Sequence, residues 1–288
     1  MKQFDRQYRL VIGDAESGDG LAIQDLQIQF RVRKSVDNKK KIDRCSISVY
    51  NLSDESLAYL ETDYPVAVFS CGYQNQLVRL FYGEVLDVET KKQGTDRVTK
   101  IDITPSFSEM THQLMSELVP ENGTVEDVIN VIRKAIGVAK GVYKGAALKQ
   151  KIVYGYPLSG TPKEMIDKVC RVYNLQWKIE GESLYINDVD SVESEIRELA
   201  PVISPSTGLI DRPYFFSDTQ NKSSKNKEKK SGVRFTALLN PNVLPGALVR
   251  VDYGEQSDYY RVEEVEFKGD FRGNSWYMDC ICSKRPEA

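Results

Sequence analysis

The stretch from residue 26 to 53 reads LQIQFRVRKSVDNKKKIDRCSISVYNLS and decides the fold class. Apolar and polar side chains alternate on both sides of its basic centre, at Leu26, Ile28, Phe30 and Val32 and again at Cys45, Ile47 and Val49. A period of two places alternate side chains on one face of a strand. The stretch therefore predicts a long β-hairpin that buries one face and ends in a polar tip.

The tip of this hairpin is rich in lysine. We single out Lys34, Lys39, Lys40 and Lys41 as candidate partner-docking residues. A plain solvated loop is the favoured interpretation of such a cluster, a docking contact is the second, and a nucleic-acid contact is the third. The sequence leaves the three interpretations open.

Outward from this hairpin, the pattern divides the chain into four parts. Residues 1–108 hold about six alternating segments and one short helix that begins after Ser53, and they predict a first β domain. Residues 109–190 form a small α+β domain with two amphipathic helices, whose start signals are Thr124 and Thr161-Pro162. Residues 191–232 are expected to be a linker with a mobile lysine-rich loop at about 217–232, for which a phosphate-binding basic tail is the alternative. Residues 233–288 predict a second β domain, too small to be stable alone, which is completed by packing on the first domain or on neighbouring chains.

Composition excludes several classes of protein. Of 288 residues, 39 are Lys or Arg and 42 are Asp or Glu, so the formal net charge is −3, which argues against a general nucleic-acid binder. The single histidine, His112, rules out sites that need two histidine ligands, and an ordinary loop residue is favoured over a catalytic base. The five cysteines form no Cys-x-x-Cys pair and are interpreted as reduced, apolar fillers. No stretch is apolar enough to span a membrane, and no targeting segment is recognised at the start.

Motifs that carry chemistry are missing from the sequence. It contains no dinucleotide fingerprint, phosphate loop or nucleophile elbow. Pattern alone therefore predicts a mainly β protein without catalytic residues, metal ligands or a cofactor.

Four groups of segments resemble, in order, the baseplate hub protein of contractile-tailed bacteriophages. They are residues 47–53 with 72–73 and 81–85; residues 160–177; residues 207–210 with Pro213; and residues 238–241 with 245–246, 260–262, 269–270 and Trp276. The resemblance implies an α+β, mainly β fold in which two tube-type antiparallel β-barrel or sandwich domains flank a small α+β domain.

The resemblance also implies a function. A hub of this family is a homotrimer whose six tube-like domains match a hexameric tail tube, and it also holds a trimeric spike. The expected partners are the tail tube protein, the central spike protein and baseplate wedge proteins, and DNA passes through without specific binding. The expected location is the tail baseplate of the virion, after assembly in the host cytoplasm. We further expect an acidic channel lining.

Two other functions remain open from the sequence. The first is the hub of a related contractile injection system or bacteriocin, which obeys the same physics. The second is a tail-associated cell-wall hydrolase, for which no residue is singled out.

Overall fold

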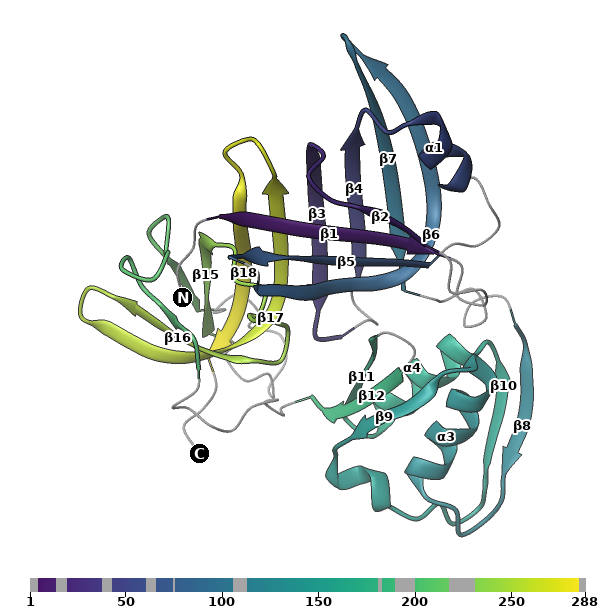
Figure 1. The fold of residues 1–288 in the computed structure, drawn as a ribbon. Coiled ribbons are helices and arrows are strands. Elements are labelled where there is room, and N and C mark those ends of the chain that lie inside the picture. Colours follow the sequence, from purple (N-terminus) through teal and green to yellow (C-terminus); the bar gives the residue numbers. More distant parts are fainter. Residues whose placement is uncertain are drawn as a thin grey trace. The chain divides into compact units, whose positions relative to one another are not determined.

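The chain folds into two compact units (Figure 1). The structure is a computed structural model that describes residues 5–13, 20–37, 43–60, 66–74, 76–105, 113–180, 183–189, 200–217 and 231–284. The larger unit comprises Met1–Ser35, Asp43–Ile103 and Val192–Ala288, and the smaller comprises Val36–Ile42 and Thr104–Ser191. The first and last parts of the chain therefore share one unit.

One large sheet builds the larger unit. Its hydrogen-bonded order is β14-β15-β18-β17-β3-β4-β7-β6-β5-β1-β2, and β16 joins at β17 with β13 beside it. The strands are β1 (Arg6–Gly13), β2 (Gly20–Ile23), β3 (Ile28–Ser35), β4 (Arg44–Tyr50), β5 (Val66–Tyr73), β6 (Gln76–Gln93), β7 (Asp96–Thr104), β13 (Val202–Ile203), β14 (Tyr214–Ser217), β15 (Ser231–Leu238), β16 (Leu248–Tyr253), β17 (Gln256–Asp270) and β18 (Trp276–Lys284). The hairpin predicted from residues 26–53 is β3 and β4, which pair from Ile28–Val49 to Arg33–Arg44.

The long strand β6 folds this sheet over itself. Its first part pairs with β5 up to Glu84, and its second part rises beside β7 as a tall hairpin (Figure 1). As a result, β1 and β5 cross the direction of β3 and β4. Phe30 of β3 meets Phe69 of β5 with ring centroids 4.7 Å apart, so the two layers pack through a shared apolar core.

The first and last β segments are joined along β3 and β17. Seven residue pairs link these strands, from Glu264–Ser35 to Asp270–Gln29. Beyond the strand ends, the Arg6 guanidinium donates to the carbonyl oxygens of Asp270, Gly273 and Asn274. We call this junction the seam. One core cluster spans both segments.

The smaller unit is the expected α+β part. Its strands form a two-stranded sheet, β8 (Met115–Val119) with β10 (Tyr156–Gly160), and a three-stranded one in the order β11-β12-β9. The other elements are α3 (Val125–Ile136), β9 (Ala139–Tyr143), the 3-10 turn η1 (Ala146–Lys149), α4 (Pro162–Val172), β11 (Leu175–Glu180) and β12 (Ser183–Asp188). Both predicted helix starts are confirmed, because Thr124 and Thr161 each close a capping box, with Asp127 and Glu164 respectively.

This unit also contains an internal repeat that the pattern of single helices did not reveal. The motif Gly123-Thr124-x-x-Asp127 recurs 160 − 123 = 37 positions later as Gly160-Thr161-x-x-Glu164. Gly137 and Asn174, again 37 apart, follow the two helices in the left-handed conformation. The preceding strands of the two copies, β8 and β10, pair with each other. The unit therefore consists of two strand–helix–strand copies with β12 added.

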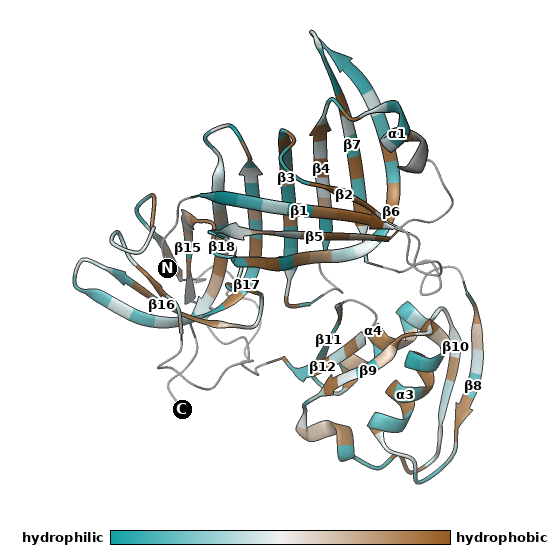
Figure 2. Cartoon of the chain, viewed as in Figure 1, coloured by the Kyte–Doolittle hydropathy of each residue, from teal (hydrophilic) through white to brown (hydrophobic). Residues whose placement is uncertain are grey.

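The predicted mainly β, α+β fold class is confirmed. Stripes of alternating hydropathy along β3, β4 and β7 are visible in Figure 2. The predicted short helix is α1 (Asp54–Leu60), and the Ser53 hydroxyl accepts the Ser56 N–H at its start. Within residues 191–232, expected as a linker, β13 and β14 join the large sheet because their neighbours β16 and β15 offer unpaired edges. The lysine-rich loop lies outside the described residues between Ser217 and Ser231.

All five cysteines are buried free thiols. Burial raises the pKa of the Cys71 and Cys280 thiols well above the usual value near 9. This is the behaviour of apolar core residues and agrees with the interpretation of these cysteines as fillers.

Candidate functional site

Eight strands of the larger unit form a continuous antiparallel layer. In order they are β14, β15, β18, β17, β3, β4, β7 and β6, and the seam lies at its middle. Four strands on one side come from the last β segment or the chain leading to it, and four on the other side come from the first. We call these eight strands the eight-stranded layer.

One face of the eight-stranded layer is apolar and the other is polar. The apolar face supplies the core, with Val32, Ile47, Phe267 and Met278 all at 1% exposure or less. The other, which we call the polar face, carries the alternate residues Arg31, Arg33, Arg44, Ser46, Ser48, Lys100, Asp102, Arg234, Thr236, Glu264, Glu266, Lys268, Asp270, Tyr277 and Asp279. Because side chains alternate along each strand, burying one face commits the other to solvent or to a partner.

Strand register aligns the polar side chains in rows across the layer. One row runs Thr236, Asp279, Glu266, Arg33, Arg44. The next runs Tyr277, Lys268, Arg31, Ser46, Asp102. The rows cross the seam without interruption, so the polar face is one surface built from both ends of the sequence.

Ion pairs within these rows balance the charge of the polar face. Glu266 lies 2.9 Å from the Lys268 ammonium and 3.7–3.8 Å from the guanidinium groups of Arg31 and Arg33. Lys268 also contacts Asp279 at 2.6 Å, and on β7 Lys100 contacts Asp102 at 2.7 Å. Each exposed pair contributes only about 0–1 kcal/mol to stability. Their main effect is that the face carries both signs of charge in similar numbers, without a basic stripe.

The pKa shifts of this face follow from the same pairs. Side-chain hydrogen bonds to Asp279 and Glu266 raise the pKa of Lys268. For Asp102, burial alone would raise the pKa, but hydrogen bonds from Lys100 and Ser46 lower it overall. The charged forms are therefore stabilised, and the pairs persist at neutral pH.

Of the predicted docking lysines, only Lys34 lies within the described residues. Lys34 lies on β3 with its side chain toward the apolar side, and it is 4% exposed. The charge of Lys34 lowers the pKa of the Cys45 thiol, against the larger effect of burial, which raises it. Lys34 therefore offers no exposed ammonium for docking, because the alternation of β3 continues two residues further than the sequence interpretation assumed. Lys39, Lys40 and Lys41 lie outside the described residues.

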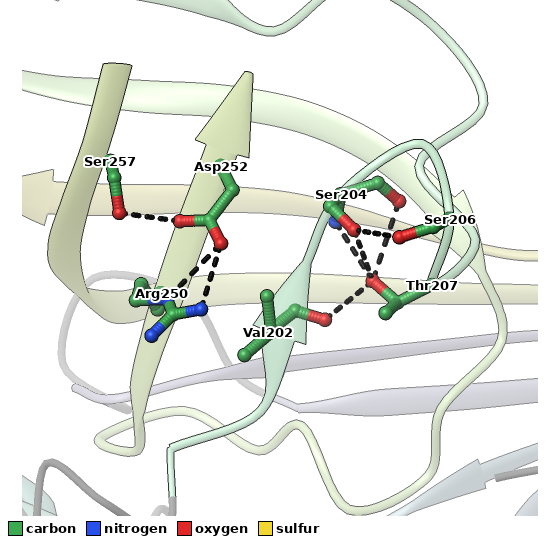
Figure 3. Close-up of polar contacts among 7 residues, drawn as sticks. All are labelled: Val202, Ser204, Ser206, Thr207, Arg250, Asp252 and Ser257. Carbon is green, nitrogen blue, oxygen red and sulfur yellow. Dashed lines mark hydrogen bonds and ion pairs between the residues drawn. The ribbon is translucent and has the colours of Figure 1, made fainter. Parts of the chain in front are cut away.

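A second polar cluster surrounds the turn after β13 (Figure 3). The Thr207 hydroxyl lies 2.6 Å from the Val202 carbonyl oxygen and accepts the Ser204 N–H at 2.8 Å. Across β16, Arg250 donates to Asp252, which also accepts from the Ser257 hydroxyl at 2.6 Å. The Ser204, Ser206 and Thr207 hydroxyls are engaged with the local backbone and with each other, so they fix the turn, while backbone pairing joins β13 to β16. It provides no activated nucleophile.

The described residues hold few ingredients for other chemistry. Among them there is no group of three or more His, Cys, Asp or Glu side chains that could hold a metal ion. In the same part of the chain, no helix is long and apolar enough to cross a membrane. His112 lies outside the described residues.

Comparisons with known proteins identify the fold. No family model matches the sequence, and no curated protein matches it. Among solved structures, a tail protein from Neisseria meningitidis MC58 superposes with a TM-score of 0.68 at 10% identity, covering 96% of each chain. The 43 kDa tail protein of prophage MuSo2 from Shewanella oneidensis gives 0.65 at 10% identity, again covering 96% of each chain. The E. coli c3393 protein, a type VI secretion component described as similar to the T4 bacteriophage tail proteins gp27 and gp5, gives 0.65 at 10% identity, covering 91% of this chain and 74% of that one.

These similarities establish that the chain has the fold of phage tail and type VI secretion proteins. The resemblance drawn from the four groups of segments is therefore confirmed at the level of the fold. The polar face and the seam are the features of this fold to which a function has to be assigned.

Proposed function

We propose that the protein is a structural hub of a phage tail baseplate, and that three copies form a ring through which DNA passes. The ring would join the hexameric tail tube to the trimeric central spike and contact baseplate wedge proteins, with its place in the virion tail. The fold shared with tail proteins supports a structural role over an enzymatic one. The E. coli secretion neighbour supports, as a second candidate, a hub in a related contractile injection machine.

The eight-stranded layer is the observation that carries this proposal. Each chain supplies two four-stranded halves joined at the seam, so three chains supply 3 × 2 = 6 halves, as a sixfold tube requires. With the apolar face turned into the core, the polar face is the surface available to line a channel. In this arrangement the lining is charge-balanced, which replaces the acidic lining expected from the sequence.

A charge-balanced lining suits the passage of DNA. Binding of proteins to DNA is driven largely by the release of counterions as Lys and Arg neutralise phosphates. On the polar face, Arg31 and Arg33 are held by Glu266, and Lys268 is held by Glu266 and Asp279. The hydrated channel surface would therefore have little net attraction for the DNA phosphates. DNA would pass through the channel without being retained.

The proposed ring predicts that the particle in solution has the mass of three chains. Purified protein should sediment at about three times the chain mass of 32.7 kDa, alone or when mixed with its tail tube protein, and negative-stain images should show a ring with threefold symmetry. A chain that stays monomeric at high concentration and with the tube protein present would contradict the ring.

The basic hairpin tip predicts a docking contact with a neighbouring tail protein. Replacing Lys39, Lys40 and Lys41 by serine should leave the threefold species intact and reduce the yield of complete tails at least tenfold. Ser35 and Asp43 should be kept, because the Asp43 carboxylate accepts the Ser35 N–H at the buried base of this loop. Serine at Lys144, Lys149 and Lys151, three exposed lysines of the smaller unit, is the matched control for lost charge. Normal tail yield from the tip variant would contradict the docking role.

A further inference from the structure

The larger unit has a second layer of strands, whose outward surface differs in composition from the polar face. This layer consists of β2, β1, β5 and the first part of β6, which are neighbours in that order. Leu10 and Phe69 point from it into the core and are fully buried. The alternate side chains of the same strands point away from the polar face, because the core lies between the two layers (Figure 1). We call this surface the outer face.

Strand register arranges the side chains of the outer face in rows. One row, which we call the basic row, consists of Arg9, Ser70 and Arg79. The next, which we call the apolar row, consists of Ala22, Val11, Val68 and Tyr82. Within one strand the two rows are two residues apart, which corresponds to about 6.8 Å. An apolar stripe therefore runs beside a stripe that carries two guanidinium groups.

The arginines of the basic row have no acidic partner among the described residues. Arg9 and Arg79 are both exposed, and neither forms an ion pair within that part of the chain. By contrast, Arg31 and Arg33 on the polar face lie close to the Glu266 carboxylate. Exposed guanidinium groups of this kind remain available for carboxylates of another molecule, to which they can donate two parallel hydrogen bonds.

The two rows together have the composition of a protein-binding surface. Ala22 is exposed, and Val11, Val68 and Tyr82 are only half-buried, so the apolar row is open to solvent. Tyrosine and arginine are typical of the residues that contribute most to binding at protein interfaces. A nucleic acid is a poorer fit, because phosphate binding relies on several cations and the next row beyond the apolar one adds only an acid, Glu84. The outer face therefore favours a protein partner with acidic and apolar side chains.

The spacing of the two arginines selects a helix over a strand in that partner. Arg9 and Arg79 lie on β1 and β6, which are separated by β5, so their Cα atoms are about 9.6 Å apart, or two strand spacings. Residues seven apart on a helix lie on the same face with a separation of about 10.5 Å. On a strand, residues of one face recur about every 6.8 Å, and no multiple of this distance matches. A helix about 10 Å in diameter, lying along the rows, would cover both of them.

We infer that the outer face binds an amphipathic helix of another tail protein. Two carboxylates seven residues apart on this helix contact Arg9 and Arg79, and its apolar side chains pack on the apolar row. This inference rests on the proposed function, because it takes the partner from the same tail. It goes beyond the ring by naming the chemistry of a contact on the side of the larger unit that faces away from the channel lining.

Allele-specific suppression tests the helix contact. Arg9→Glu and Arg79→Glu, made singly, should each reduce the yield of complete tails at least tenfold. The mass of three chains and the urea unfolding midpoint should stay unchanged, because both side chains are exposed. Selection of suppressors in the other tail proteins should then rescue each variant by a change of one acid to Lys or Arg. The two acids should lie seven residues apart in one protein, and neither suppressor should rescue the other variant.

The controls separate this contact from a general effect of charge. Lys144→Glu and Lys151→Glu, at two exposed cations of the smaller unit, should give normal tail yield. Should a glutamate variant lose the three-chain mass, the tenfold loss would have to appear in Arg9→Gln with Arg79→Gln, which removes only the two positive charges.

Several outcomes would overturn the helix contact while leaving the proposed ring intact. They are normal tail yield from the Arg9 and Arg79 variants, suppressors at scattered positions or within this chain, and loss of duplex-DNA binding with normal yield, which would assign the basic row to nucleic acid. A monomeric mass of the unmodified chain would instead overturn the proposed ring, so the two failures are distinguished by the mass measurement.

Discussion

Replacing Gly269 by alanine is expected to destabilise the larger unit by about 1–3 kcal/mol, the usual cost of overpacking a core. Gly269 stands opposite Phe30 at the seam, and an added Cβ would lie 2.1 Å from Cε1 of the Phe30 ring. The ring has little room to move away, because it packs against Phe69 and Trp276 with centroid distances of 4.7 and 5.2 Å. Phe30 would have to leave its position, and β3 would separate from β17.

The two tryptophans allow this change to be measured in one unit. Trp276 lies at the seam in the larger unit and Trp177 lies in the smaller unit, each 1% exposed. In a Trp177→Phe background, urea unfolding followed by fluorescence reports the seam alone, which avoids treating both units as one two-state transition. The unfolding midpoint should fall, and the threefold species should be lost with it.

Two control variants make the seam prediction specific. Gly254→Asn changes a turn glycine with positive φ and open space around it, and asparagine tolerates that conformation, so stability should change little. Adding Phe30→Leu to Gly269→Ala removes the ring atoms nearest the new Cβ, so the double variant should lose less than the sum of the two single losses. Strict additivity, or an unchanged midpoint for Gly269→Ala, would contradict the packing described for the seam.

Reversing charges on the polar face should trap DNA. Glu266→Lys with Asp279→Lys changes the charge by 2 × 2 = +4 per chain, from −3 to +1, and leaves Arg31, Arg33 and Lys268 without their acidic partners. Because the original pairs are partly exposed, each lost pair should cost about 0–1 kcal/mol of stability. Each added phosphate contact should steepen the salt dependence of DNA binding. The logarithm of the binding constant should fall by about 0.9 more per contact for each unit rise in the logarithm of the salt concentration.

The expected result is normal tail assembly with infectivity reduced at least tenfold and DNA retained in the tail. Purified rings should also bind duplex DNA at low salt and release it as salt rises. The matched control is Glu121→Lys with Glu255→Lys, two exposed acids that are not part of the polar face, which gives the same net charge. Equal DNA binding by both double variants would attribute the effect to net charge and would exclude a special role of the polar face.

Several elements were predictable because local chemistry specifies them. The hairpin of β3 and β4 follows from alternation at Phe30 and Val32, and the helix starts follow from Thr124 and Thr161, whose hydroxyls cap nearby N–H groups. The 37-residue repeat of the smaller unit was also present in the sequence. A comparison of the chain with itself at a fixed offset would have found the matching Gly-Thr pairs.

The candidate site was not predictable in the same way. Alternation identifies two faces on each strand but does not say which strands are neighbours, so the row from Asp279 through Glu266 to Arg33 has no signature in the sequence. The lysine cluster drew attention to Lys34, which the register turns inward. Asp270 shows the same dependence on distant contacts: burial alone would raise its pKa, but hydrogen bonds from Gln27 and Gln29, more than 240 residues away, lower it.

The sequence by itself determined the mainly β class, the two capped helices, the apolar role of the cysteines and the near-balance of charge. These properties depend on spacing, capping and composition, which act over a few residues. Only the tertiary structure decided that the first and last β segments share one sheet, that Gly269 makes room for Phe30, and that opposite charges align into one polar face. The reason is physical: strand pairing joins backbone groups that any residue carries, so the choice of partner comes from the packing of side chains across the whole unit.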